Sequence, residues 1–168
     1  MEQTQPKIGK FSLNYGLILG AVSVVFGLML FSMDAHTSQD TSNTVIGIVL
    51  AVAIVIWALI NFRKANEGKL SLGQAIKMGI GICLVSGVIY IVYLILLANV
   101  LDTDFITKIA ENTKRAAEEA GVMTAEQIQQ QYQGTIDYFW ISYPFILIAS
   151  VIQGLIIGLI GGLIFKKS

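Results

Sequence analysis

The amino-acid sequence predicts an all-α, polytopic membrane protein with four transmembrane helices. Four long stretches of the 168-residue chain contain no Asp, Glu, Lys, Arg or His. The whole chain is 55% hydrophobic and only 13% charged, with a mean hydropathy of +0.71. A soluble domain carries about a quarter charged residues, whereas about 20 apolar residues in a helix cross a hydrocarbon core about 30 Å thick. The composition therefore predicts a chain that is solvated by a bilayer.

The charge-free stretches set the expected limits of the four spans. We expect transmembrane helices at residues 11–33, 44–62, 76–101 and 139–165. The first stretch is longer than the apolar region of a signal peptide, about 7–15 residues, and no small-residue cleavage site follows it, so we interpret it as a retained span. Before the third span, Ser71 and Gln74 have the spacing of a capping box, which places the start of that helix near Leu72.

The positions of the basic residues predict the orientation. Eight of the eleven Lys and Arg residues fall in segments 1–10, 63–77 and 166–168, and the other three fall in segment 102–138. Short loops that are rich in Lys and Arg stay in the cytoplasm. The sequence therefore predicts that both termini are cytoplasmic (N-in, C-in) and that segments 34–43 and 102–138 lie outside.

Segment 102–138 is expected to form a helical hairpin outside the membrane, between the third and fourth spans. Apolar residues recur at helical spacing from Phe105 to Ala120, and Gly121 can end that helix. Thr124 and Gln127 form a second capping box, which starts a further short helix. The apolar stripe is thin, so the hairpin should lie on the bilayer surface or on the bundle.

Small residues at four-residue spacing mark candidate helix-packing faces. The glycines concerned are Gly16, Gly20, Gly47, Gly154, Gly158 and Gly162. Small side chains let two helix backbones approach closely, which favours association in lipid. Packing within one chain is the favoured interpretation, and homo-oligomerisation through the fourth span is the alternative.

Gln153 is the polar residue nearest the middle of the fourth span. An amide without a hydrogen-bond partner is costly in hydrocarbon. We therefore expect Gln153 to face another helix and to form a hydrogen bond with it; lining a pore is the less favoured alternative.

The sequence offers little for catalysis or metal binding. The charge-free stretches contain no ionisable residue of the kind that marks proton pathways, which argues against a proton-coupled transporter acting as a monomer. His36 lies near Asp34 and Asp40, where a solvated loop is favoured over a metal site. An enzyme would need Asp102, Asp104 and Asp137 to converge.

The single cysteine, Cys83, lies inside the third stretch and excludes an internal disulfide. The basic residues are scattered flanks that topology explains, so nucleic-acid binding is not supported. We expect neither enzymatic activity nor a cofactor or metal.

The loop between the second and third spans carries a family resemblance. Residues 61–79 read NFRKANEGKLSLGQAIKMG. This segment resembles the signature of the bacterial domain-of-unknown-function family four-one-nine-nine, although Leu72 stands where that pattern favours Phe. The long polar insertion and a glycine-rich fourth span ending in Lys-Lys are similar to the family too. The resemblance implies a four-helix inner-membrane protein of Gram-negative bacteria, and it transfers no catalytic or ligand-binding residue.

Two functions remain as hypotheses. The first is a non-enzymatic subunit or scaffold that works through helix packing and its outer loop. The second is a small channel or transporter formed by oligomerisation through the glycine-rich fourth helix. The expected partners are the lipid bilayer and either further copies of the chain or another membrane protein.

Overall fold

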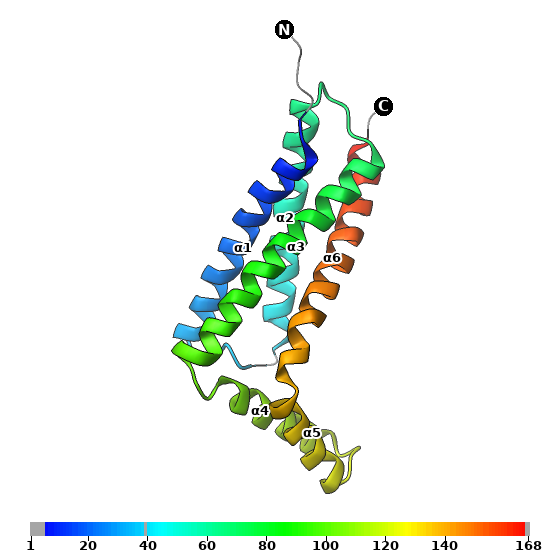
Figure 1. Ribbon diagram of the computed structural model, residues 1–168. Helices are drawn as coiled ribbons and strands as arrows, with labels where there is room; N and C mark the ends of the chain where they lie inside the picture. The colour runs from blue at the N-terminus through cyan, green and yellow to red at the C-terminus, as the bar shows by residue number, and fades with distance from the viewer. Residues whose placement is uncertain (1–5, 39, 167–168) are drawn as a thin grey trace.

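The computed structural model describes residues 6–38 and 40–166 as a bundle of long helices with two shorter helices across one end (Figure 1). The elements in chain order are α1 (Ile8–Ser32), α2 (Thr41–Ala65), α3 (Leu72–Leu96), the π-helical turn η1 (Leu97–Leu101), α4 (Phe105–Ala120), α5 (Ala125–Asp137), the 3₁₀ turn η2 (Phe139–Ile141) and α6 (Ser142–Phe165). The described residues are all-α, as predicted, and four segments are long and apolar enough to cross a membrane: Ile8–Ser32, Thr41–Ala65, Leu72–Leu101 and Phe139–Phe165.

Three of the long helices start before the charge-free stretches. The hydroxyl of Ser71 accepts a hydrogen bond from the amide of Gln74, whose side chain accepts one from the amide of Ser71, so the predicted capping box is confirmed. Asp40 caps α2 by accepting from the amide of Ser42. Absence of charge marks only the part of a helix that lies in hydrocarbon, whereas caps set where the helix begins.

The start of α1, the end of α6 and the α2–α3 loop lie at one end of the bundle, called the terminal end (Figure 1). The short helices α4 and α5 lie at the other end, called the hairpin end. Gly121 ends α4 with a left-handed φ of +64°, and the predicted capping box of Thr124 and Gln127 starts α5. The predicted end of α4 at Gly121 and the predicted start of α5 after Thr124 are thus confirmed.

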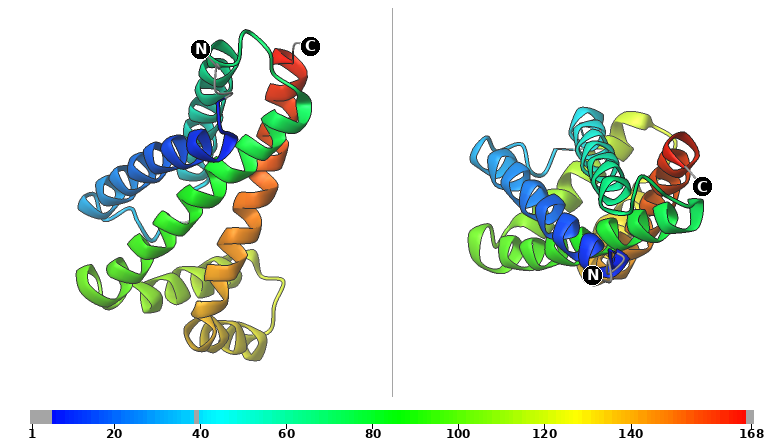
Figure 2. Two further views of the ribbon diagram at one scale, coloured as in Figure 1. Left: turned by 45° about the horizontal axis from the view of Figure 1, so that its top comes forward. Right: turned by 90° about the horizontal axis from the view of Figure 1, so that it is seen from above.

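α3 is the central helix, packed along α1 on one side and along α6 on the other (Figure 2). Glycines permit these contacts. A Cβ atom added at Gly16 would lie 2.6 Å from the Cβ of Val85, and one added at Gly158 would lie 2.7 Å from the carbonyl oxygen of Ala75. Gly20, Gly154 and Gly162 are crowded by α3 in the same way. The glycine face of α6 is therefore covered by α3 of the same chain.

α2 packs differently along its two halves. The half of α2 that is nearer the terminal end contributes the fully buried residues Val55, Ala58 and Leu59 to the core there. In contrast, none of residues 41–50 is buried. Gly47, which the spacing places on a packing face, has no atom within 4 Å of an added Cβ. It differs from the other five glycines because α2 stands away from its neighbours toward the hairpin end.

Candidate functional site

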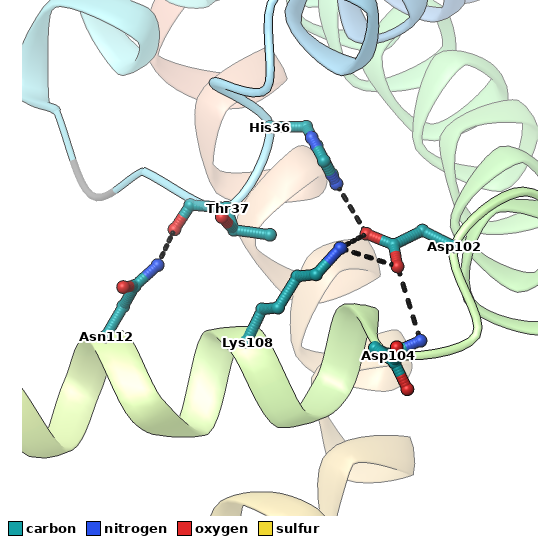
Figure 3. A network of polar contacts seen from close by, with 6 residues as sticks. All are labelled: His36, Thr37, Asp102, Asp104, Lys108 and Asn112. Carbon is teal, nitrogen blue, oxygen red and sulfur yellow. Dashed lines mark hydrogen bonds and ion pairs between the residues drawn. The ribbon is translucent and has the colours of Figure 1, made fainter.

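Three polar side chains from distant segments meet at the hairpin end, and we call them the polar network (Figure 3). His36 lies in the α1–α2 loop, Asp102 directly follows η1, and Lys108 lies on α4. The Nε2 atom of His36 is 2.8 Å from Oδ2 of Asp102. The ammonium of Lys108 donates to both carboxylate oxygens, at 2.9 and 2.8 Å. One carboxylate therefore ties three segments together.

The local structure explains how Asp102 reaches this place. The π-helical turn ends with the amide of Asp102 donating to the carbonyl of Leu97 at 2.8 Å. The amide of Asp104 then donates to Oδ1 of Asp102 at 3.3 Å. A second hydrogen bond between the α1–α2 loop and α4 lies beside the network: the side-chain amide of Asn112 donates to the carbonyl of Thr37 at 2.9 Å (Figure 3).

Aromatic rings enclose the histidine. The ring of His36 makes an edge contact with Phe31 at a centroid distance of 5.0 Å and stacks on Phe105 at 5.9 Å. The side chains of His36 and Asp102 are only 5% and 8% exposed, whereas that of Lys108 is 45% exposed. The carboxylate–imidazole pair is thus shielded from solvent, whereas the side chain of Lys108 is partly exposed to it.

Hydrogen bonding around the carboxylate shifts the pKa values of Asp102 and Lys108 in opposite directions. The hydrogen bond from Lys108, and then that from His36, lower the pKa of Asp102 below its usual value. The hydrogen bond to Asp102 in turn raises the pKa of Lys108. Because an ionised carboxylate only accepts hydrogen bonds, Nε2 of His36 carries the donated proton.

The prediction of a solvated loop for His36 is wrong. The apolar cage of Phe31 and Phe105 and the pairing with Asp102 bury the imidazole. Asp34 and Asp40 do not join His36: Asp40 caps α2, and Asp34 occupies a turn with a φ of +53°. Among the described residues, there is no group of three His, Cys, Asp or Glu side chains that could hold a metal ion.

The three aspartates that an enzyme would need to bring together, Asp102, Asp104 and Asp137, lie in two separate places. Asp104 lies beside the polar network, where its backbone amide donates to the side chain of Asp102. Asp137 instead accepts a hydrogen bond from Gln133 on α5 at 3.3 Å. A positively charged lysine, rather than a second carboxylate, pairs with Asp102, so the arrangement is suited to holding segments together.

The pairing predicts a pH window for the stability of the hairpin end. A lowered carboxylate pKa contributes stability above the unfolded value of about 3.9, and that contribution is lost as pH falls through the folded pKa. A raised lysine pKa contributes stability below about 10.4, and that contribution is lost as pH rises through the folded pKa. We therefore expect the difference in melting temperature between the native protein and Asp102→Asn to be greatest between about pH 4 and 10 and to shrink below pH 4. A difference that is constant from pH 3 to 7 would contradict this.

A cavity of about 430 Å³ lies between α1, α3, α6 and the half of α2 that is nearer the hairpin end, which we call the outward half of α2. The loop residues His36 and Ser38 line it toward the hairpin end, and Leu19, Ala51 and Cys83 line it toward the middle of the bundle. Its wall carries the polar residues Ser23, Ser86, Ser150 and Gln153. Gly47 also lines the cavity, which explains the open space beside it.

Gln153 lies on the cavity wall without a hydrogen-bond partner among the described residues. The expected hydrogen bond to another helix is therefore not seen among the described residues, and the amide borders the cavity instead. Ser23 and Ser150 are satisfied by the carbonyls of Leu19 and Ile146 on their own helices. Its polarity near the middle of the fourth span marked Gln153 in the sequence, but nothing in the sequence indicated the cavity.

A comparison with protein families identifies the chain as a whole. The model of a family described as protein of unknown function (DUF4199) matches residues 14–167. The chain belongs to the DUF4199 family. The resemblance of residues 61–79 is thereby confirmed, and the DUF4199 match includes every residue of the polar network and of the cavity wall named above. No curated protein and no solved structure matches the chain.

Proposed function

We propose that this DUF4199 protein is a non-enzymatic subunit or scaffold of the bacterial inner membrane that holds a partner protein at its hairpin end. The observation that carries the proposal is the polar network. A buried carboxylate that joins the α1–α2 loop to α4 fixes the hairpin in one orientation on the bundle. A surface presented in one orientation loses less conformational freedom when a partner binds.

The distribution of charge supports an outward-facing hairpin. The start of α1 and the α2–α3 loop, which lie at the terminal end (Figure 1), carry basic residues, and short basic loops stay in the cytoplasm. The proposal therefore has both termini in the cytoplasm and the hairpin outside. Exposed Tyr138 and Trp140 at the start of the last span suit the interface between lipid headgroups and water.

A polar groove beside the network supplies a surface for a partner. It has a volume of about 390 Å³ and lies between the α1–α2 loop and α4. Its lining combines the acids Asp34 and Glu119 with the base Arg115. Mixed charges of this kind favour an extramembrane segment of another protein that carries both signs, because complementary charges set specificity and orientation.

The channel hypothesis receives less support. It needs a free glycine face on α6 for oligomerisation, and α3 of the same chain covers that face. The buried side chains of Val55, Leu59 and Ile82 also fill the bundle at the terminal end. We therefore favour the scaffold over the channel.

Site-specific photo-cross-linking in native membranes tests the scaffold proposal. A photoreactive amino acid at Arg115, in the groove, is expected to give one discrete protein adduct. The same amino acid at Gln130, which is exposed on α5, is the matched control and is expected to give no such adduct. The adduct from position 115 should weaken in Asp102→Ala, because that change frees the hairpin. Equal adducts from both positions, or no protein adduct from either, would contradict the proposal.

A further inference from the structure

We propose that the cavity beside α2 is a binding site for a neutral, membrane-soluble amphiphile whose carbonyl or hydroxyl group bonds to Gln153 and Ser86. The inference is independent of the scaffold function. It rests on the size and place of the cavity, on two polar side chains without partners, and on the absence of acidic and basic lining residues other than His36.

The size and depth of the cavity fit a small lipid-like molecule. Its volume of about 430 Å³ is within the range of about 300–1,000 Å³ that is usual for ligand sites. Along α2 it extends from Asn43 to Ala51, roughly 12 Å at the rise of an α-helix. That is close to the thickness of one leaflet of hydrocarbon, about 15 Å. An extended chain of one leaflet can therefore lie in it.

The cavity is closed toward the terminal end and open toward lipid. Beyond Ala51, the side chains of Val55, Leu59 and Ile82 do not line the cavity but are fully buried in the core of the bundle, which is packed closed there. Around the outward half of α2 the packing is loose: none of residues 41–50 is buried, and an added Cβ at Gly47 meets no atom. A ligand that is dissolved in the bilayer can thus enter beside α2, and it cannot pass through the bundle.

Two side chains in the wall are free to form hydrogen bonds with an occupant. Ser86 is 7% exposed and has no hydrogen-bond partner among the described residues, and neither has the amide of Gln153. Polar groups at membrane depth are unfavourable without partners, because hydrocarbon offers none. An amide and a hydroxyl together donate and accept, so they match a carbonyl or hydroxyl group of a ligand.

The lining also selects against charge. Apart from His36, which is paired with Asp102, every named polar residue of the lining is uncharged: Ser23, Ser38, Asn43, Thr44, Ser86, Tyr90, Ser150 and Gln153. A carboxylate or phosphate placed beside Gln153 would lose its hydration without gaining a counter-ion. The site therefore favours a neutral amphiphile over a fatty acid or a phospholipid headgroup.

Photolabelling of the full-length protein in lipid nanodiscs tests the site. The probe is a twelve-carbon fatty alcohol that carries a diazirine and a terminal alkyne. We expect saturable labelling that unlabelled dodecanol competes away and that maps to peptides of α2, α3 and α6. The corresponding fatty acid should label at least tenfold less at these peptides.

Two variants separate binding from folding. Gly47→Leu is expected to reduce labelling at least tenfold, because Gly47 lines the cavity and an added Cβ meets no atom there, so the leucine takes up space that the ligand needs. Gly9→Leu is the matched control: this exposed glycine of α1 also has open space beside it, and it is not in the cavity lining. Gln153→Leu should lower labelling while the melting temperature stays equal or rises. Labelling that is unchanged in both Gly47→Leu and Gln153→Leu would overturn the proposal, since it would show partition onto the protein surface or a cavity that holds only water.

Discussion

Replacing Gly158 with leucine is expected to separate α6 from α3 and to cost the protein at least about 3 kcal/mol, the upper part of the usual range for overpacked cores. An added Cβ would lie 2.7 Å from the carbonyl oxygen of Ala75 and 2.9 Å from the Cα of Ile76. Both are backbone atoms, so no side-chain rotation can relieve the clash. Thermal unfolding in mild detergent measures the effect.

Gly73→Leu is the matched control for that change. Gly73 lies in the first turn of α3 and has no atom within 4 Å of an added Cβ. We expect its melting temperature to equal or exceed that of the native protein, because leucine favours the helix more than glycine does. Equal melting temperatures for Gly158→Leu and Gly73→Leu would contradict the close backbone contact between α3 and α6.

The second large effect is expected at Asp102. In Asp102→Ala the buried Nε2–H of His36 loses its acceptor, and a buried donor left without a partner costs about 1–3 kcal/mol. Amide hydrogen exchange should accelerate in α4 and in the α1–α2 loop, and exchange in the core at the terminal end should change little. Hydrogen–deuterium exchange with mass spectrometry resolves these segments.

Lys108→Met serves as the comparison for Asp102→Ala. Lys108 is 45% exposed and contacts the same carboxylate, so its loss leaves the pair of His36 and Asp102 intact. We expect a smaller acceleration of exchange in α4, because half-exposed ion pairs contribute little. Equal acceleration of exchange in both variants would contradict the claim that the hydrogen bond between His36 and Asp102 holds α4 in place.

The sequence was sufficient for features that depend on local chemistry. The charge-free stretches located the four spans, and the residue pairs Ser71–Gln74 and Thr124–Gln127 located two helix starts. Gly121 located the end of α4. Each of these signals acts between residues that are close in the chain, so one sequence reveals it.

Features that depend on distant contacts could not be predicted in this way. His36 and Asp102 are 66 positions apart, and only the fold brings them together. Gly47 and Gly154 carry the same small-residue spacing, yet one borders a cavity and the other is pressed on a neighbouring backbone. Spacing shows which residues share a helix face, and it does not show which helix, if any, covers that face.

The distance between α2 and α4 at the hairpin end tests most directly whether the polar network holds the hairpin in one orientation. Spin labels at exposed Val45 and Glu118, in a Cys83→Ser background, report that distance by double electron–electron resonance. If the polar network holds the hairpin in one orientation, the protein gives a single narrow distance distribution, and Asp102→Ala broadens it. A distribution that is already broad with Asp102 in place would contradict the account.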